Sequence, residues 1–316
     1  MEKSARTAPS VAVGRALSQV GKGGRMSSMF QTRRSLLHAG AVVTFSSLAA
    51  LSVLAQTAQA SVQSPFDHTH ATWTALLKQH VLLIDGGNGS AVDYRGFAND
   101  RAILTGYLRQ LSAITPATFE RFAPLQQQAF LINAYNAFTV DLILTRYPDL
   151  TSIKDLGSLF TSPWAKSWIE LLGRTQSLDD IEHGVLREPG RYDNPYIHFG
   201  VNCASIGCPM LREEAFVAEQ LDAQLAAQAE RFMADTTRNR FDAERGTLYL
   251  SKIFDWYGED FEKGYRGIDS ITGFARQYAV ALAPDALARE RLLNEPVSIR
   301  FLSYDWDLND TATLSP

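Results

Sequence analysis

The fold is decided by residues 124–146, which read PLQQQAFLINAYNAFTVDLILTR. Pro124 suits the first turn of a helix, and the residues that follow are apolar on most sides of a helical period. A helix that is apolar nearly all round is buried, so we expect a central core helix that ends before Tyr147-Pro148. The other elements are expected to pack around this helix.

Two polar residues, Asn133 and Asn136, lie three residues apart on one side of this helix. Buried amides need hydrogen-bond partners. Two interpretations stay open: the pair cross-links backbone groups of the core, or it lines a site and contacts a substrate.

The remaining pattern predicts more helices and several short strands. Helices are expected over about 67–80, 99–111 and 211–235, hairpins over 168–178 and 239–250, and single strands over 196–203 and 297–304. Helices first and antiparallel strands later predict an α+β fold, with a helical N-terminal half packed on a small, mainly antiparallel sheet.

Residues 1–60 have the pattern of an N-terminal extension with an export signal. Arg33 and Arg34 precede an apolar run over 39–54, and residues 58–60 (Ala-Gln-Ala) have the form of a signal-peptidase site. The arginine pair favours twin-arginine export. We expect cleavage near Ala60 and a periplasmic or secreted protein, and no later stretch predicts a membrane span. The start codon could be Met1, Met26 or Met29.

The mature chain, residues 61–316, is acidic. Residues 1–60 hold seven of the 30 basic residues but one of the 34 acidic ones, which leaves 23 basic and 33 acidic residues and a net charge near −10. Such a charge argues against nucleic acid or anionic lipid as the main partner. Without a linker or an internal repeat, this length predicts a single α+β domain.

The two cysteines, Cys203 and Cys208, lie close together. Cys203 ends the strand expected over 196–203, whose alternation places His198 and Asn202 on one face. A turn of small residues follows, and its free amides could lower the pKa of a thiol and bind an oxyanion. Cys203 is therefore a candidate nucleophile, although a Cys203–Cys208 disulfide is an equally open interpretation outside the cytoplasm.

A nucleophilic thiol needs a base, and His183 and His198 are the nearby candidates. His183 points away from the apolar side of a short helix expected to begin near Asp179. Cys203, His183 and either Glu182 or Asn202 would form a Cys-His-acid or Cys-His-amide set. Glu182 would orient its neighbour only if the turn is distorted, and it could instead cap the helix that Asp179 begins.

Other polar residues have less defined roles. Arg187 could bind a substrate carboxylate, or simply place a positive charge at a helix C-terminus. Residues 67–70 (Asp-His-Thr-His) contain an H-x-H step, but as the first turn of a helix they favour capping over a metal. We therefore expect no metal and no cofactor. Asp305 and Asp307 are expected to fasten a terminal loop.

These residues resemble the family catalogued as domain of unknown function 547 (DUF547). The matching motifs are Asn133–Asn136, Leu178–His183 with Leu186-Arg187, Phe199–Ser205 with Cys208-Pro209, Asp255–Tyr257 with Asp260-Phe261, and Tyr304–Asn309. The core of the resemblance covers roughly residues 120–235. It implies that the Glu-His pair and the Asn-Cys pair converge on one site. A papain-like fold would have a permuted order here, because His183 precedes Cys203.

Two functions stay open. The first is an exported thiol-dependent hydrolase or acyltransferase that acts on an amide, peptide or ester of the cell envelope, with Cys203 as nucleophile and His183 as base. In this reading four residues contact a small-molecule or peptide substrate: Asn133, Asn136, His198 and Arg187. The alternative is a non-catalytic exported binding or scaffold domain, in which a Cys203–Cys208 disulfide closes a buried polar network.

Overall fold

The computed structural model describes residues 66–158 and 161–314. The helices are α1 (Ala71–His80), α2 (Tyr94–Asn99), α3 (Arg101–Ser112), α4 (Pro116–Phe119), α5 (Pro124–Leu144), α6 (Leu178–Ile181), α7 (Leu221–Ala234), α8 (Ile253–Trp256), α9 (Ile271–Gln277), α10 (Ala279–Leu282) and α11 (Ala286–Asn294). The strands are β1 (Val81–Ile84), β2 (Gly89–Val92), β3 (Ile169–Leu171), β4 (Arg174–Gln176), β5 (Arg240–Asp242), β6 (Thr247–Leu250) and β7 (Ser298–Phe301). The export signal expected in residues 1–60 lies outside the described residues.

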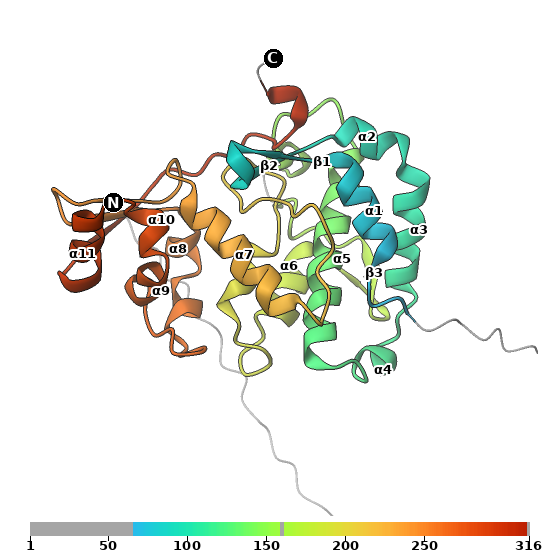
Figure 1. Ribbon diagram of the computed structural model, residues 1–316. Helices are drawn as coiled ribbons and strands as arrows, with labels where there is room; N and C mark the ends of the chain where they lie inside the picture. Colours follow the sequence, from blue (N-terminus) through green and yellow to red (C-terminus); the bar gives the residue numbers. More distant parts are fainter. Residues whose placement is uncertain (1–65, 159–160, 315–316) are drawn as a thin grey trace, which may run out of the picture. The chain divides into compact units, whose positions relative to one another are not determined.

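Helix α5 is the central helix that the sequence predicts. It begins at Pro124 and ends at Leu144, and residues on most of its sides are buried. The Gln126 side chain accepts a hydrogen bond from the Ala123 amide (3.0 Å), which satisfies one of the free donors at the helix start. Figure 1 shows α1 to α5 on one side of the described fold, α8 to α11 on the other, and α7 between them.

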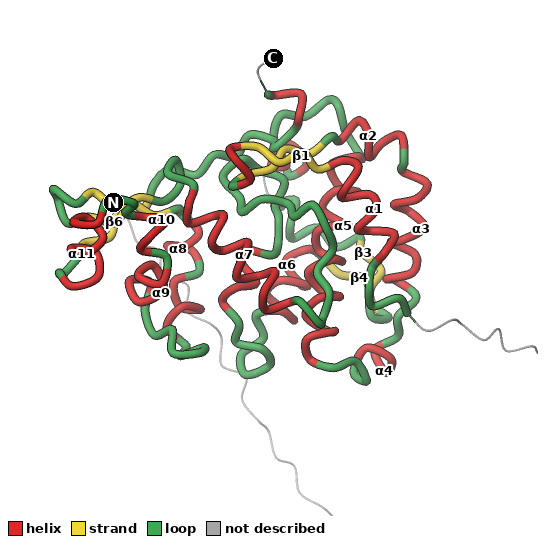
Figure 2. The backbone as a smooth tube through the Cα atoms, viewed as in Figure 1, coloured by secondary structure: helices red, strands yellow, loops and turns green. Residues whose placement is uncertain are grey.

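The strands form three small sheets, drawn in yellow in Figure 2. β1 pairs with β2, β3 with β4, and β5 with β6, all antiparallel, whereas β7 pairs with β6 in parallel. The predicted α+β class and its mainly antiparallel pairing are confirmed. The strands of the two predicted hairpins also form, and the β1–β2 hairpin is an addition that the sequence pattern did not reveal.

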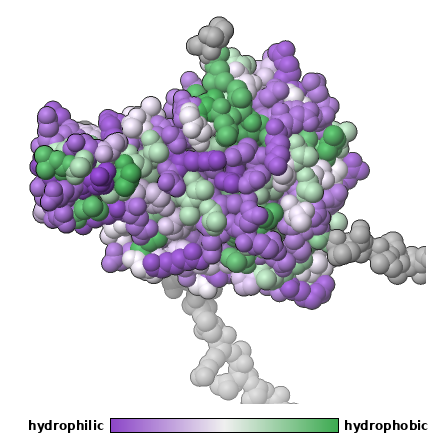
Figure 3. Space-filling model, in the orientation of Figure 1, coloured by the Kyte–Doolittle hydropathy of each residue, from purple (hydrophilic) through white to green (hydrophobic). Residues whose placement is uncertain are grey.

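Buried apolar side chains form two clusters, one around α5 and one among α7 to α11. A short 3₁₀ helix, Pro195–Phe199, joins them, because Ile197 belongs to the first cluster and Phe199 to the second. The chain just before Cys203 is therefore fixed between two packed regions. Figure 3 shows the opposite character outside: the face in view is mostly hydrophilic, with apolar residues in separate patches.

The strand expected over 196–203 is wrong. Pro195 fits the first position of the 3₁₀ helix, and the Asn194 side chain accepts a hydrogen bond from the Tyr196 amide. Ile197 and His198 are both buried, 1% and 2% exposed, so the alternation does not separate an inner from an outer face. A segment buried on all sides can match a strand pattern without being a strand.

The helix expected over 211–235 starts ten residues late. Only Leu221–Ala234 is helical, and the chain before it has turns and irregular backbone. Side chains satisfy part of this backbone, because the Phe216 amide donates to Asn133 and the Val217 amide to Gln224. Amphipathic spacing alone could not reveal these partners.

Two smaller predictions differ from the structure. Helix α1 begins at Ala71 rather than near Asp67, whose carboxylate accepts hydrogen bonds from the Thr69 and Ala71 amides at 2.9 and 3.0 Å. In α3, Leu104, Tyr107, Leu108 and Leu111 are buried, whereas Ile103 beside them is 50% exposed. Within the described residues, no helix is long and apolar enough to cross a membrane.

Candidate functional site

Two asparagines of α5 hold the neighbouring loop by its backbone. Asn136 donates to the Gly200 carbonyl and accepts from the Asn202 amide, both at 2.8 Å. Asn133 donates to the Phe216 carbonyl (2.7 Å) and accepts from the Phe216 amide (3.0 Å). Both side chains are buried, and neither lines a cavity. This geometry fits the predicted cross-linking of core backbone and does not fit the substrate-binding alternative.

Asn202 shapes the turn that contains Cys203. Its Oδ1 accepts from the Ala204 amide (3.0 Å) and its Nδ2 donates to the Pro209 carbonyl (2.8 Å). Ala204 has a φ of 61°, in the left-handed region that residues with a side chain seldom adopt. Because Asn202 is occupied inside the turn, the catalytic role predicted for it does not fit the structure.

The C-terminal segment runs along this turn and binds its amides. Ile206 N donates to Asp307 O and Gly207 N to Asp305 O, both at 2.9 Å. A Cβ at Gly207 would lie 2.8 Å from Asp305 O, so this close approach of two backbones requires glycine. Since the Ile206 and Gly207 amides already have partners, these two amides do not fit the predicted oxyanion site.

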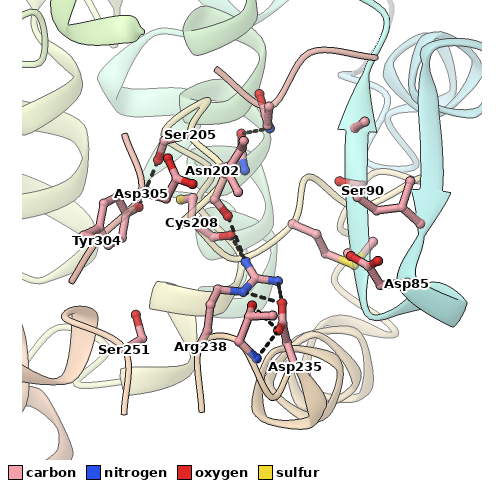
Figure 4. Close-up of a pocket in the computed structure, with 18 of the residues that line it drawn as sticks. Asp85, Ser90, Asn202, Ser205, Cys208, Asp235, Arg238, Ser251, Tyr304 and Asp305 are labelled. Atoms are coloured by element: carbon pink, nitrogen blue, oxygen red, sulfur yellow. Dashed lines mark hydrogen bonds and ion pairs between the residues drawn. The ribbon is translucent and has the colours of Figure 1, made fainter. Parts of the chain in front are cut away.

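Cys203 Sγ lies among hydroxyl and thiol donors. It is 3.0 Å from Ser205 Oγ and 3.1 Å from Tyr304 OH. Ser205 Oγ and Tyr304 OH also lie 3.1 Å apart, a contact visible in Figure 4. The Cys208 thiol, as a donor, does most to lower the pKa of Cys203; burial opposes this effect, and the two hydroxyls support it. Three donors therefore favour the thiolate of Cys203.

Cys208 is the less acidic thiol of the pair. Burial raises its pKa, and its contact with Cys203 raises it further. The Cys203 amide donates to Cys208 Sγ (3.0 Å), and both cysteines are free in the structure. Cys203 therefore ionises first while Cys208 stays protonated. The disulfide weighed from the sequence stays a prediction.

Cys203 lines a cavity with a volume of about 340 Å³. Glu182 and His183 line the same cavity, and so does His198. Segments that are separated in the sequence thus bring the thiol, a carboxylate and two imidazoles to one space. Arg187 does not line it.

Glu182 and His183 begin a π-helical turn, Glu182–Leu186, directly after α6. Ser177 caps α6 and exchanges hydrogen bonds with Asp180, so the helix starts earlier than expected and the predicted capping role of Glu182 is wrong. Glu182 is instead buried at the cavity wall, where it accepts a hydrogen bond from Tyr257. The turn is distorted, as an orienting Glu182 would require, but Glu182 Oε1 is 4.0 Å from His183 Nδ1.

The ring of His183 has other partners. Its Nδ1 accepts from Arg187 Nη1 (2.8 Å), and its Nε2 lies 3.7 Å from Asp179 Oδ1. An arginine can only donate, so this contact occupies the ring's lone pair. His183 in this position has no free lone pair for the Cys203 thiol.

His198 is held differently, by Asp260. Its Nε2 lies 2.7 Å from Asp260 Oδ2, and its ring stacks on Tyr257 with centroids 4.2 Å apart. Burial acts to raise the pKa of Asp260, but hydrogen bonds from His198, Arg187 and Lys263 outweigh it and lower that pKa. The ionised carboxylate fixes the proton on Nε2, which leaves the lone pair on Nδ1. That Nδ1 is buried and has no hydrogen-bond partner among the described residues.

Arg187 therefore contacts side chains behind the cavity wall and does not line the cavity itself. Its Nε donates to Asp260 Oδ2 (2.6 Å), and its guanidinium lies 4.8 Å from the Tyr257 ring centroid. The substrate contact predicted for Arg187 does not fit these partners. Asp260 and Tyr304 are the functional residues that sequence reasoning missed. Both lie in motifs that were noticed, but only the folded chain brings them to His198 and Cys203.

A second cavity, about 510 Å³ in volume, also borders this turn (Figure 4). It shares Cys208 and Tyr304 with the first cavity, and Asn202 and Ser205 line it, but Cys203 does not. Its Arg238 is bound to Asp235 and to backbone carbonyls of the turn. Although this cavity is larger, the titratable groups that could act on a thiol lie in the smaller one, so we place the site there.

The stretch Asp67–His70 forms a turn before α1. His70 Nδ1 lies 2.7 Å from Tyr107 OH, and burial lowers the pKa of His70 to about 4. Over residues 66–158 and 161–314, no group of three or more His, Cys, Asp or Glu side chains is placed to hold a metal ion.

Comparison with protein families gives a match for the middle of the chain. Residues 119–233 match the model of the family described as "Protein of unknown function, DUF547". The matched segment contains Glu182, His183, His198 and Cys203. No curated protein and no solved structure matches the chain.

Proposed function

We propose that this chain, whose residues 119–233 match the DUF547 family, is an exported thiol-dependent hydrolase or acyltransferase acting on an amide, peptide or ester of the cell envelope. One observation carries this proposal: at the wall of a cavity, Cys203 Sγ lies 3.0 Å from Ser205 Oγ and 3.1 Å from Tyr304 OH. Hydrogen bonds to the charged form of a thiol make it a better nucleophile at neutral pH.

The proposed reaction has two halves. Cys203 first gives its thiol proton to the histidine; the thiolate then attacks the carbonyl carbon, and an S–C bond forms while the carbonyl π electrons move to oxygen. The tetrahedral intermediate then collapses and expels an amine or an alcohol, which takes a proton from a protonated histidine. Water, or another nucleophile in acyl transfer, next attacks the thioester, gives a proton to that histidine and releases Cys203 as thiolate.

Hydroxyl groups supply the proposed oxyanion stabilisation. Negative charge moves from the sulfur of Cys203 to the carbonyl oxygen during the attack, and Tyr304 and Ser205 lie next to that sulfur. Hydroxyl donors that stabilise the thiolate can also donate to the carbonyl oxygen when negative charge forms there. Burial and the charge of Cys203 raise the pKa of Tyr304, so its hydroxyl keeps the proton that it donates.

We assign the proton transfers to His198 rather than to His183, the base expected from the sequence. His198 has a free Nδ1 and an orienting carboxylate on Nε2, the arrangement of a general base. The corresponding lone pair of His183 is bound to Arg187. Within the described part of the chain, neither ring is in direct hydrogen-bond contact with Cys203, so we propose that the contact of His198 forms in the substrate complex, as catalytic contacts often do.

Export is part of the proposal and rests on the sequence of residues 32–60. The arginine pair, the apolar run and the cleavage motif near Ala60 support it. We expect the mature protein in the periplasmic fraction or the medium. Replacing Arg33 and Arg34 with lysine should retain the full-length protein in the cytoplasm, whereas the same change at the exposed Arg300 should not. Equal export of both variants would contradict the twin-arginine route.

Alkylation of the mature protein by iodoacetamide tests the function. Mass spectrometry would locate the label over a range of pH, before and after reduction. We expect Cys203 to label rapidly below pH 7 while Cys208 stays unlabelled, because only Cys203 is stabilised as thiolate. A labelling midpoint at the ordinary thiol value of about 8.5 would contradict the proposal. Protection of both cysteines until reductant is added would favour the scaffold alternative with its disulfide.

Hydrolysis of an activated ester, such as a nitrophenyl ester, separates the roles. Cys203→Ala should abolish the protein-dependent rate. His198→Ala should lower it about 10²- to 10⁴-fold, the usual effect of losing a general base, and His183→Ala should lower it less. Equal losses in the two histidine variants would contradict our assignment of the base.

A further inference from the structure

The cavity beside Cys203 has an aromatic wall. Six aromatic side chains line it: Tyr135, Trp164, Trp256, Tyr257, Tyr304 and Trp306. Trp306 is central to this wall, with ring centroids 4.5 Å from Tyr304 and 5.6 Å from both Trp164 and Trp256. Trp256 is 43% exposed, so part of the wall is open to a ligand.

The charged groups of this cavity are acidic. Asp179 and Glu182 line it, and among the described residues no lysine or arginine does. Glu182 is buried, whereas Asp179 is half-exposed. The faces of aromatic rings also carry negative potential. The cavity therefore presents negative charge from its carboxylates and from its rings.

The chain already places a cation on this wall. The ammonium group of Lys154 lies 3.9 Å from the Trp306 ring centroid, although Lys154 does not line the cavity. The guanidinium of Arg187 takes a similar position against Tyr257. Two rings of the wall are thus already in cation–π contact with cations of the protein itself.

We propose that this cavity recognises an ammonium group of the substrate, held against the aromatic wall and near Asp179 and Glu182. The carbonyl group of the same molecule would face Cys203. The inference rests on the proposed function for the reacting group, and it narrows the substrates to amides or esters that carry an amine or a quaternary ammonium. Anionic acyl groups should be excluded, because two carboxylates line the cavity.

Protection of Cys203 from iodoacetamide tests this inference. Choline carries the cation, and 3,3-dimethyl-1-butanol is its neutral isostere. We expect choline to protect at concentrations about tenfold lower than the isostere, the ratio that a partly desolvated cation–π contact supports. Equal protection by the two compounds would overturn the inference and would indicate a site for neutral apolar groups instead.

A matched pair of variants tests the acidic part. Asp179→Asn removes a carboxylate of the cavity and should reduce the preference for choline over its isostere about threefold. An effect of this size is typical of the loss of one half-exposed charge pair. Asp149→Asn removes an exposed carboxylate that does not line the cavity and should leave the preference unchanged. The same preference in both variants would overturn the role of Asp179.

The two proposals fail in different ways. Rapid labelling of Cys203 without any preference for choline would contradict the proposed ammonium site and would leave the proposed thiol chemistry supported. Slow labelling would remove the thiol chemistry, and tryptophan fluorescence titrated with choline and its isostere would then still measure the binding. A fluorescence change at equal concentrations of both would overturn the ammonium site by a route independent of Cys203.

Discussion

Replacing Tyr304 with phenylalanine tests how Cys203 is activated. The change removes one oxygen, which lies 3.1 Å from Cys203 Sγ, and keeps the ring in the aromatic wall. A hydrogen bond to a charged group contributes about 1.5–3 kcal/mol, and we take about 1.5–2 kcal/mol because Tyr304 is half-buried. At a pH below the titration midpoint, the thiolate population should therefore fall about ten- to thirtyfold.

The labelling rate should fall less than the thiolate population. A thiolate of higher pKa is intrinsically more nucleophilic, with a Brønsted coefficient of about 0.4–0.5. This gain offsets nearly half of the loss on a logarithmic scale. We therefore expect iodoacetamide to label Cys203 of Tyr304→Phe about four- to sixfold more slowly at such a pH, with the midpoint moved to higher pH.

The control is Tyr257→Phe. Tyr257 lines the same cavity, but its hydroxyl donates to Glu182 rather than to Cys203. Its removal should leave the midpoint of Cys203 nearly unchanged. The reasoning would be refuted if Tyr304→Phe kept the wild-type midpoint, or if both variants moved it equally, because the hydroxyl of Tyr304 would then not be what stabilises the thiolate.

Three further results are expected. Asn133→Ala should lower the free energy of unfolding in urea by about 2–4 kcal/mol, because it leaves the buried amide and carbonyl of Phe216 unpaired; a loss below 1 kcal/mol would argue against this cross-link. Burial lowers the pKa of His70 to about 4, below its unfolded value of about 6.5, so stability should fall by up to about 3 kcal/mol as the pH drops between these values. His70→Phe should flatten that dependence, and parallel curves would contradict it. Gly207→Ala should lower the melting temperature, whereas Gly184→Ala, where a Cβ meets nothing within 4 Å, should not; similar temperatures would show that the close approach at Gly207 can relax.

The sequence predicted best those helices and strands whose own residues determine their structure. Helix α5 is apolar on nearly every side, and the β3–β4 hairpin turns at Gly173, so local residues determine both. The segment 196–203 misled the prediction because it is buried between two clusters, where alternation has no meaning. The late start of α7 has the same kind of cause, since the α5 side chain of Asn133 bonds the backbone of Phe216.

The sequence predicted where the candidate site lies, but it did not predict what each residue contacts there. The motifs led to Cys203, Glu182, His183 and His198, which share one cavity. Which histidine has a free lone pair depends on Arg187 and Asp260, and spacing along the chain does not encode such contacts. The papain-like order and the single-domain interpretation of residues 61–316 stay predictions.

The cavity beside Cys203 is lined partly by residues of the segment that matches the family model and partly by residues beyond it. Residues 119–233 supply Cys203, the carboxylates of Asp179 and Glu182, and both histidines of the cavity. Four aromatic residues of the cavity come from the chain beyond that segment: Trp256, Tyr257, Tyr304 and Trp306. The thiol and imidazole groups of the cavity and four of its six aromatic side chains thus come from separate stretches of the chain. A chimaera that keeps residues 119–233 and exchanges the later stretch would change what the cavity accepts. It would also change the reactivity of Cys203, because Tyr304 belongs to the exchanged part and contacts the sulfur.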